Sequence, residues 1–526
     1  MKYVLLIAYL VFAWRRLATY LHIFQQEEYQ SVRFVRWLFQ TRSLDLRVSI
    51  VVLVVGALQF AVRLAFGVGA LFIIAAMLGI AIYEKKLRAA SKKRLVMTAR
   101  ATRIYWVGFS ALGLIGMLYA LTDVPLLAWL IPVHAVPFAL PLAALILSPH
   151  EKSVQKRFWN EAHRKLRALS PTVIGITGSY GKTSTKHLLG HILELQAPTL
   201  ITPGSVNTPM GVSRVIREQL GAHHRFFVCE MGAYGPGSIA RLCRLAPPDV
   251  AVITGIGMAH YERFKTLDTV AAAKFELANA AAARNGEIIL SDSVLKFETA
   301  REFRDQNRAK TVTVGFNAQS EFNIVNAGQT TAGIMAQVMW KDQLYLLRAP
   351  IFGEHHIGNM AVAFATACAV GILPEDAILA LNSAPQISHR LELKEGVAGS
   401  RLIDDAYNSN PVGFASALKL LNELRVDGGR RILVTPGMVE LGTAHDEEHR
   451  NIGLLARSSV DILLPVLPQR IASLIAGFEL DNPGGIVVPC ANFAAAQEWM
   501  NGNLRSADVV LLENDLPDLY EKKLSL

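Results

Sequence analysis

Hydrophobic residues are concentrated at the front of the chain. Arg63 is the one Lys, Arg, Asp or Glu in four long apolar runs, which cover residues 48–66, 68–83, 104–121 and 124–147. A shorter run, 3–14, opens the chain; basic residues follow it without a small-residue cleavage site, which favours a membrane segment over a signal peptide. Because roughly 20 apolar residues span a bilayer, we predict an α-helical membrane domain over 1–150 with about five transmembrane helices.

The hydrophobic pattern changes after residue 150. Short apolar runs at 226–233 and 249–257 alternate with helix-like segments, such as the alanine-rich stretch 269–283. Alternation of this kind predicts an α/β domain with a mainly parallel sheet, which we place at 151–385.

A second change of pattern follows Pro385. A helix-like segment at 412–424 lies among strand-like runs, which cover 430–437, 460–466 and 509–514. These elements predict a separate, smaller α/β domain with its own sheet at 386–526.

Charge placement orients the apolar segments. The stretches 25–47 and 84–103 are rich in Lys and Arg, whereas the short links near Gly67 and Asp123 carry almost none. By the positive-inside rule, both basic stretches are cytoplasmic. Five spans then leave the N-terminus outside and everything after about residue 148 in the cytosol.

The net charge of +10 is local to the same region. Lys and Arg exceed Asp and Glu within 1–150, while the rest of the chain is close to neutral, so we expect no nucleic-acid binding. The basic stretches suit anionic lipid head groups instead. The four cysteines show no metal-ligand spacing or pairing pattern, as expected in a reducing compartment.

The segment VIGITGSYGKTSTKHLL, 173–189, carries the clearest chemical signal. It reads as a strand, a glycine-rich turn and a helix, the context of a phosphate-binding loop. Backbone N–H groups at the start of a helix bind phosphate, a lysine reaches the outer phosphates, and a hydroxyl can bind Mg²⁺. Lys182 and Thr183 fit these roles. The first glycine stands at 175, one position earlier than in the general P-loop pattern, so an ordinary glycine-rich turn remains the alternative.

Two further side chains are expected near this loop. Glu230 follows one predicted strand, and His260 lies just beyond the next. Ligands of parallel sheets gather at the carboxyl ends of the strands. A carboxylate and an imidazole beside nucleotide phosphates are candidate Mg²⁺ ligands, although each taken alone is more often structural.

Eight ordered blocks of the chain resemble the Mur ligase family, the ATP-dependent amide-bond ligases of peptidoglycan precursor synthesis and their folate and polyglutamate relatives. The blocks are GITGSYGKTST (175–185), EMGA (230–233), ITGIGMAHYERF (253–264), AKFE (273–276), GEHHIGNMAVAFA (353–365), SHRLE (388–392), DDAYNSNP (404–411) and GMVELG (437–442) with His449. The last two are most similar to the members that add D-alanyl-D-alanine to a UDP-linked muramoyl tripeptide. The resemblance implies a P-loop ATPase central domain and a Rossmann-like C-terminal domain.

The resemblance also implies an ADP-forming reaction through an acyl phosphate, with ATP and Mg²⁺ as cofactors. It assigns nucleotide contacts to Gly178, Ser179, Gly181, Lys182, Thr183, Ser184, Asn359, Arg390, Asp405 and Tyr407. It assigns metal ligation to Thr183, Glu230 and His260, catalysis to Lys182, Lys274, His260 and Arg390, and substrate contacts to Asn408 and Asn410. Lys274 matches a lysine that is carbamylated in several members.

Two departures from the family pattern stand out. His356 occupies a place where asparagine is common. In addition, the soluble domain that grips the UDP part of the substrate is absent, because 147–173 has room for one linking helix only. We hypothesise that the muramoyl-peptide or other carboxylate substrate is lipid-linked or presented at the surface of the bacterial inner membrane.

Other functional classes remain open. Within the ligases, the alternative is a membrane-associated synthetase of the poly-γ-glutamate type. Outside them stand a P-loop transporter and a non-catalytic envelope scaffold, which has no need of Lys182, Glu230, His260 and Lys274 together.

Overall fold

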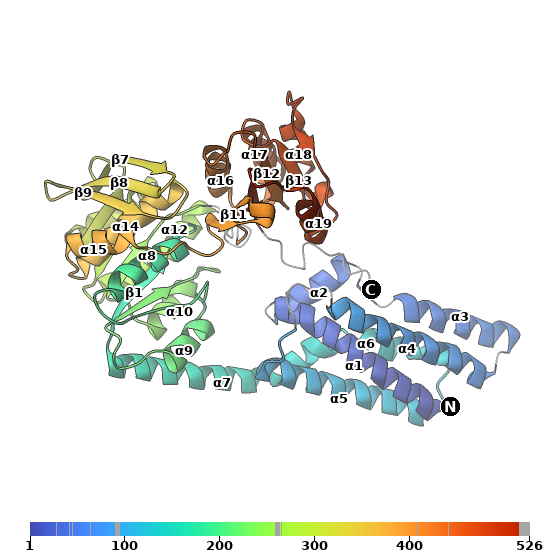
Figure 1. Cartoon of the computed structure of the whole chain (residues 1–526). Coiled ribbons are helices and arrows are strands. Elements are labelled where there is room, and N and C mark those ends of the chain that lie inside the picture. Colours follow the sequence, from blue (N-terminus) through green and yellow to red (C-terminus); the bar gives the residue numbers. More distant parts are fainter. Residues whose placement is uncertain are drawn as a thin grey trace. The chain divides into compact units, whose positions relative to one another are not determined.

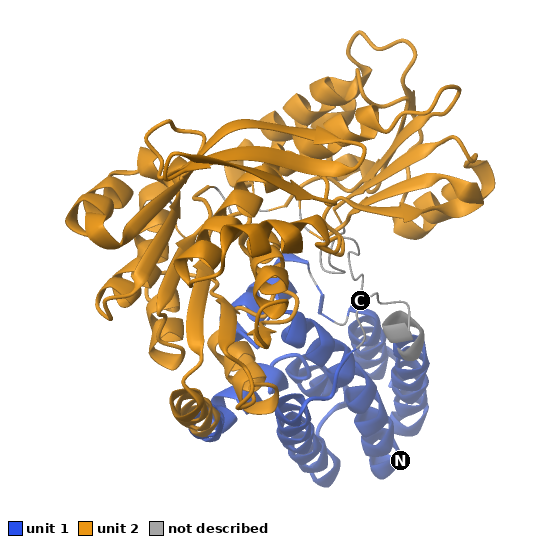
Figure 2. Ribbon diagram, turned by 60° about the vertical axis from the view of Figure 1, so that its left-hand side comes forward, with its two compact units in different colours: residues 1–155, 516–526 blue, residues 156–515 orange. Residues whose placement is uncertain are grey.

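The computed structural model in Figure 1 describes residues 1–27, 29–41, 43–44, 46–63, 65–89, 95–257, 264, 266–407, 409–439 and 441–514. The chain forms two compact units, and their described parts cover 1–155 and 156–514 (Figure 2).

The first unit is built of helices in its described part. They are α1 (Lys2–Gln26), α2 (Ser31–Gln40), α3 (Leu46–Val62), α4 (Phe66–Ala89), α5 (Ala99–Leu121), η1 (Leu126–Trp129), α6 (Leu130–Ala135) and the first half of α7 (Ala139–Leu169). Helix α1 packs against both α4 and α5, and its Tyr9, Phe12 and Phe24 are fully buried. This helix is therefore the centre of the unit's hydrophobic core.

Three of these helices, α1, α4 and α5, are long and apolar enough to cross a membrane, by length and composition. Helix α3 has 17 residues and is shorter than that standard. The run predicted as one span at 124–147 is divided among η1, α6 and α7, and its two helical parts, bent by 48°, meet the same standard only when taken together. Proline supplies the reason, since Pro125, Pro132 and Pro137 lack the N–H that a continuous helix needs.

The predicted boundaries at the basic residues also need correction. Helix α1 continues well past the predicted end at residue 14, and α4 extends into the stretch read as a loop from 84 onward. Arg16 and Glu84 form a buried ion pair, which Thr19 joins through a hydrogen bond to Glu84. A buried pair satisfies both charges, so the helices need not end where the charges begin.

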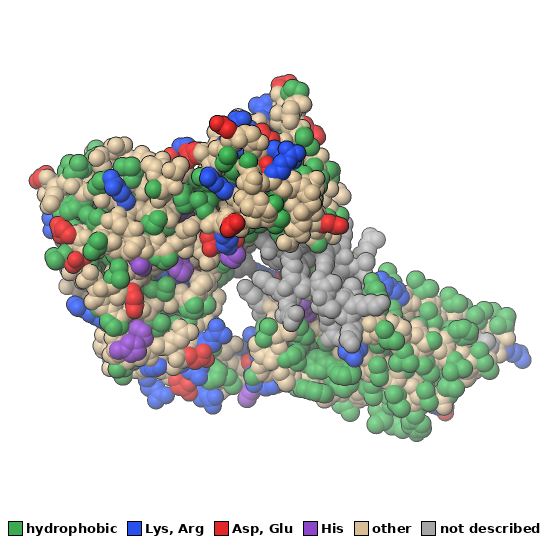
Figure 3. All heavy atoms as spheres, in the orientation of Figure 1, with side chains coloured by type: hydrophobic (Ala, Val, Ile, Leu, Met, Phe, Trp, Pro, Cys, Tyr) green, Lys and Arg blue, Asp and Glu red, His purple; other side chains and the backbone are tan. Residues whose placement is uncertain are grey.

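Exposed apolar side chains cover the visible face of the helical unit (Figure 3). Large hydrophobic residues of this unit, such as Phe60, Leu114 and Leu145, are at least 70% exposed. A surface of this kind is expected of helices that face lipid.

The second unit contains a sheet of nine strands in the order β2-β3-β1-β4-β5-β6-β7-β8-β9. The strands are β1 (Thr172–Thr177), β2 (Thr199–Ile201), β3 (Phe226–Glu230), β4 (Val250–Ile253), β5 (Glu287–Ser291), β6 (Thr311–Gly315), β7 (Phe322–Thr330), β8 (Gly333–Trp340) and β9 (Gln343–Ala349). Pairings from β2 to β7 are parallel, and β7, β8 and β9 are antiparallel. The sheet is thus mainly parallel, as predicted.

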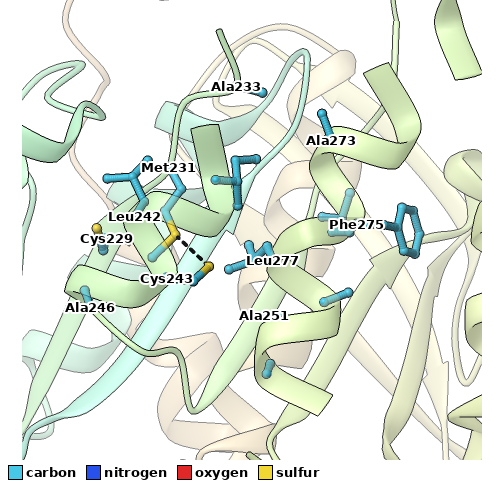
Figure 4. Packing of buried hydrophobic residues seen from close by; sticks show 14 of the residues in the cluster. Cys229, Met231, Ala233, Leu242, Cys243, Ala246, Ala251, Ala273, Phe275 and Leu277 are labelled. Carbon is cyan, nitrogen blue, oxygen red and sulfur yellow. Dashed lines mark hydrogen bonds between the residues drawn. The ribbon is translucent and has the colours of Figure 1, made fainter. Parts of the chain in front are cut away.

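Helices cover both faces of this sheet. They are α8 (Lys182–Glu194), α9 (Pro209–Glu218), α10 (Ser238–Leu245), α12 (Leu267–Ala282), α13 (Glu298–Gln306), α14 (His355–Ala369) and α15 (Pro374–Asn382), with short 3-10 turns η2 (Asp292–Lys296) and η3 (Arg308–Lys310). Alternate residues of a strand enter different cores: Phe227 and Cys229 join α10 and α12, whereas Phe226 and Val228 join α8 and α14. Figure 4 shows the first core, where Cys243 of α10 contacts Met231 and lies beside Leu277 of α12.

A second sheet follows in the order β10-β11-β15-β12-β13-β14. Its strands are β10 (Glu392–Glu395), β11 (Arg401–Asp405), β12 (Arg431–Thr435), β13 (Ile462–Pro465), β14 (Ile486–Val487) and β15 (Val509–Glu513). Its helices are α16 (Pro411–Glu423), α17 (His445–Ala456), α18 (Ala472–Glu479) and α19 (Phe493–Asn503), with turns η4 (Val397–Gly399), η5 (Gly442–Ala444) and η6 (Pro468–Arg470). Only the edge pair β10–β11 is antiparallel.

Candidate functional site

The glycine-rich turn joins β1 to α8 as the sequence predicts. Gly181 caps α8 in the left-handed region at φ +80°, so the backbone N–H groups of the helix start face the turn. Lys182 Nζ donates to the carbonyl oxygen of Gly178 at 2.7 Å and to that of Ser179 at 3.3 Å. The lysine therefore folds back over the turn, where its charge faces any phosphate bound by the backbone.

Two neighbours hold this turn closely. A Cβ on Gly178 would lie 2.1 Å from Thr254 Oγ1, and one on Gly181 would lie 2.1 Å from Asn359 Oδ1. Ser179 Oγ donates to the carbonyl of Gly257 and accepts from its N–H, both at 2.9 Å. The shape of the loop is therefore fixed by the ends of neighbouring elements.

Glu230 ends β3 and lies against the start of α8. Its Oε2 accepts from Thr183 Oγ1 at 3.0 Å and from Lys186 Nζ at 3.1 Å, and its Oε1 accepts from Asn207 Nδ2 at 3.1 Å. Burial alone would raise the pKa of Glu230, but the charges of Lys186 and Lys182 and the bond from Asn207 outweigh it and lower that pKa. Glu230 is therefore an ionised, buried carboxylate beside the glycine-rich turn.

These side chains fit a magnesium ion. Two neighbouring oxygens of an octahedral Mg²⁺ site lie about 3.0 Å apart when each is about 2.1 Å from the ion. Thr183 Oγ1 and Glu230 Oε2 have this separation, 3.0 Å. His260, the other predicted ligand, lies outside the described residues.

Lys274 lies on α12 between Ala273 and Phe275, two residues of the core shown in Figure 4, and is only 4% exposed. Burial lowers the pKa of its amine well below the ordinary value, and the charge of Lys182 lowers it further. Lys274 makes no hydrogen bond or ion pair with another residue in the described part of the chain. A lowered pKa favours the neutral, nucleophilic form of the amine.

Arg390 belongs to the segment that enters the second sheet, and it faces the same region. Its guanidinium lies 4.5 Å from the centre of the Tyr407 ring. Burial lowers the pKa of Lys182. The negative charge of Glu230 acts in the opposite direction, and the positive charges of Arg390 and Lys186 lower the pKa further. Because one arginine acts on the loop lysine from the other sheet, cations from both sheets converge on one place.

The remaining predicted residues are distributed between the two sheets. Tyr407 OH bonds to Ser205 Oγ, while Asp405 is buried at the end of β11. Asn410 Oδ1 accepts from the N–H of Gly413 at 3.0 Å and so caps α16, and its contact with substrate remains a prediction. Asn408 lies outside the described residues, and Ser184 is buried in α8.

Asn359 lies in α14 directly against the turn. Its Nδ2 lies 3.2 Å from His356 Nδ1, the position at which the sequence departs from the family pattern. Burial and the charges of His355 and Arg390 lower the pKa of His356 well below its ordinary value. A neutral histidine therefore replaces the neutral amide without adding charge.

Sequence analysis missed two groups at this site. Lys186 stands four residues after Lys182, one helical turn on, and that spacing could have predicted a second cation on the same helix face. Asn207 had no local signal. Its position is fixed by Tyr234, whose OH donates to Asn207 Oδ1 at 2.8 Å.

A second acidic cluster lies near Arg390 but is already occupied. His389, Glu392 and Asp404 lie close enough to one another to hold a metal. Lys394 Nζ fills the space between the carboxylates, 2.8 Å from Glu392 Oε2 and 2.6 Å from Asp404 Oδ2. This arrangement is an ion-pair cluster.

Comparison with known proteins agrees with this geometry. The family model of the Mur ligase middle domain matches residues 176–367, and that of the Mur ligase glutamate ligase domain matches 389–513. UDP-N-acetylmuramoyl-tripeptide–D-alanyl-D-alanine ligase of Bacillus subtilis (strain 168) is 31% identical over 288 residues, which are 55% of this chain and 61% of that protein. The enzyme of the same name from Mycobacterium tuberculosis (strain H37Rv) is 31% identical over 366 residues, 65% of this chain and 70% of that one.

Solved structures give the same result. MurF from Acinetobacter baumannii has a TM-score of 0.59 at 25% identity, over 70% of this chain and 78% of its own. The MurF ligase from Thermotoga maritima in complex with ADP has a TM-score of 0.59 at 24% identity, and the match covers 70% of this chain and 82% of that one. The chain thus spans between about six and eight tenths of the length of these relatives.

Proposed function

The chain belongs to the Mur ligase family, and from that premise we propose that it is an ATP-dependent, ADP-forming amide-bond ligase of peptidoglycan precursor synthesis. One observation carries the proposal: Lys182 and Thr183 of the glycine-rich turn face Glu230 in the first sheet, and Arg390 acts on the same turn from the second. Phosphoryl transfer depends chiefly on positioning and charge neutralisation, which these groups supply.

The reaction has two steps. A carboxylate oxygen of the acid substrate bonds to the γ-phosphorus of ATP as the bond to ADP breaks, which gives an acyl phosphate. The nitrogen of the amine substrate then bonds to the acyl carbon, the amine loses a proton, and inorganic phosphate leaves. Lys182 and Arg390 hold the phosphate oxygens, and the remaining predicted nucleotide contacts orient adenine and ribose.

Thr183 and Glu230 would hold Mg²⁺, together with His260. The bound ion would neutralise phosphate charge. Lys186 and Asn207 keep the Glu230 carboxylate ionised and oriented toward Thr183. A carbamate on Lys274 would add a negative charge beside this cluster, and the neutral amine is the form able to react with CO₂.

The substrates are proposed from the relatives. Their names specify a UDP-N-acetylmuramoyl tripeptide and D-alanyl-D-alanine. We propose an acid of the muramoyl-peptide type and D-alanyl-D-alanine or another amino compound as the amine, with Asn408 and Asn410 toward the substrates. The apolar helices of the first unit support an inner-membrane location with the ligase part in the cytosol, and an acid that is lipid-linked or presented at the bilayer.

The test uses full-length protein in detergent or lipid nanodiscs. ADP formation is measured with D-alanyl-D-alanine or single amino acids, against UDP-linked and lipid-linked muramoyl peptides. We expect ADP only when an acid and an amine are both present, and Lys182→Ala to abolish it. ADP formation that needs no amine would contradict the ligase. Successive additions of one amino acid would indicate a poly-γ-glutamate-type synthetase, and no turnover with any pair would indicate a scaffold.

A further inference from the structure

Two buried carboxyl groups end neighbouring strands of the second sheet. Asp405 is the last residue of β11 and Glu513 the last of β15, and the two are paired in the parallel register. Asp405 is 6% exposed and Glu513 is fully buried. Side chains two residues apart on a strand lie on the same face. Ile403 and Leu511, two residues before Asp405 and Glu513, lie in one hydrophobic core, so both carboxyl groups lie on the core side of their strands. Their side chains therefore enter the same core side by side.

Two like charges this close in a buried site cannot both be ionised, so the pair shares a proton. Burial raises the pKa of Glu513 well above its ordinary value, and the neighbouring Asp405 raises it further. Burial also raises the pKa of Asp405, to about 6, against the opposing charge of Arg390. Ser409 donates to Glu513 Oε1, while Oε2 is buried and receives no hydrogen bond in the described part of the chain, so no donor there stabilises a charge on that oxygen.

Asp405 is tied to the backbone next to Arg390. Its Oδ1 accepts the N–H of Leu391 at 3.3 Å. Leu391 has φ +50° and His389 has φ +58°, so left-handed backbone stands on both sides of Arg390. Non-glycine residues keep this conformation only where their surroundings hold it. On the other side of the arginine, His389 Nδ1 lies 2.8 Å from Asp404 Oδ2.

This strained segment sets the direction of Arg390. The guanidinium stacks on Tyr407, and its charge acts on Lys182 in the turn as well as on Asp405 and Glu513 beneath it. The charge of Arg390 therefore acts both on the acidic pair and on the lysine of the glycine-rich turn. The charge of the pair decides how strongly the arginine is drawn away from the turn.

We propose that Glu513 is a positioning residue for Arg390: by sharing one proton with Asp405 it keeps the pair at a single negative charge, which anchors Leu391 and leaves the guanidinium free to bind the terminal phosphate of the nucleotide. This inference rests on the proposed function and extends it to a residue outside the nucleotide contacts. Among the described residues, Arg390 and Asp404 are the charged groups that act on the pair. Loss of the shared proton at high pH adds a second negative charge and draws Arg390 back.

Nucleotide binding to the full-length protein tests this without turnover. The readout is the ratio of the affinity for a non-hydrolysable ATP analogue to that for ADP, because only the analogue has the γ-phosphate that Arg390 would contact. The variants are Glu513→Gln, Glu513→Leu and Arg390→Ala. Glu498→Gln is the control, since Glu498 is exposed on α19, a helix that packs against the same sheet. Thermal unfolding of each variant checks that it folds.

We expect Arg390→Ala to lower the ratio by about tenfold, the size of one lost charge-assisted contact. Glu513→Leu should lower it by a similar factor, because it leaves the Asp405 carboxylate without the donor of the shared proton, so that its full charge draws Arg390 away from the turn. Their combination should lower it no further than Arg390→Ala alone. Glu513→Gln, which keeps a neutral donor, should retain the wild-type ratio at neutral pH and remove its decline at high pH. Glu498→Gln should change neither.

Two results separate this inference from the proposed function. If the wild type binds both nucleotides and Glu513→Leu keeps the wild-type ratio, or if Glu513→Gln keeps the wild-type decline at high pH, the positioning role is wrong and the ligase stands. If the wild type binds neither nucleotide, the proposed function and this inference both fail.

Discussion

The ammonium nitrogen of Lys186 lies 3.1 Å from Oε2 of Glu230, and both side chains are almost fully buried. The same oxygen accepts from Thr183, so a predicted metal-binding carboxylate shares one cluster with a structural lysine. Removal of one partner of a buried pair leaves an uncompensated charge, which is more costly than loss of the attraction itself.

We therefore expect Lys186→Met to lower the free energy of unfolding by about 3 kcal/mol. Denaturant unfolding of the full-length protein measures this, with Lys296→Met at an exposed position as the control. The pKa of Glu230 is lowered in the folded protein, so its stabilising contribution is present above the ordinary value of 4.5 and is lost as pH falls through the lower folded value. In Lys186→Met this loss should begin at a higher pH. Equal stability of variant and wild type would show that the pair contributes nothing.

Gly181 should tolerate no side chain. Its φ of +80° disfavours other residues, and a Cβ would lie 2.1 Å from Asn359 Oδ1. Gly181→Ala is expected to weaken ATP binding by about tenfold or more, measured by calorimetry. Gly358→Ala is the control, because its Cβ would meet nothing within 4 Å in the neighbouring α14. That change should leave ATP binding intact and stabilise the helix by about 0.5–1 kcal/mol.

Lys274 should react with carbon dioxide. Burial lowers the pKa of its amine and so favours the neutral form that reacts with CO₂, unlike Lys186, which is ion-paired. With ¹³C-bicarbonate we expect a carbamate carbon signal in NMR spectra that is absent from Lys274→Arg. Activity of the variant should fall by about 10–100-fold, as for residues that support a metal site. A signal that persists in Lys274→Arg would assign the carbamate to another amine.

The buried pair of Arg16 and Glu84 should hold α1 against α4. Arg16→Met alone or Glu84→Met alone should destabilise the helical unit by about 3–5 kcal/mol, because each leaves one buried charge. The double variant should be less destabilised than the two single changes together predict, which a double-mutant cycle of thermal unfolding in detergent measures.

The control for this cycle is Lys2→Met. Its partner Asp123 is 95% exposed, so solvent screens the pair and we expect no measurable change. Strict additivity of Arg16→Met and Glu84→Met would show that the two charges do not interact.

Much of the α/β part could be predicted because its signals are local. The glycine spacing before Lys182 and the hydrophobic runs that became β3, β4, β12 and β15 lie within a few residues of the features they predict. The alternation along β3 even places Glu230 on the same face as Phe226 and Val228, which pack with α8. Applied to that strand, the rule would have predicted a contact between Glu230 and a polar residue of α8.

The apolar runs predicted where membrane-type helices would form, but not their ends. Hydropathy is a local property of the sequence, so charged residues such as Arg16 and Glu84 mark the ends of the predicted helices. It carries no information about the ion pair between these two residues, which joins α1 to α4. It also read 124–147 as one span, although the proline positions in the same run mark the break.

The sequence by itself determined the local features: a glycine-rich turn with a lysine between a strand and a helix, a carboxylate at the end of a strand, and apolar helices before them. Only the tertiary structure decided which distant residues share one environment. Lys186 meets Glu230 across a gap of 44 residues, and Asp405 meets Glu513 across 108, because strand order and register place them together. Periodicity records which side of a strand or helix is buried, whereas the partner on that side depends on long-range pairing that no local pattern encodes.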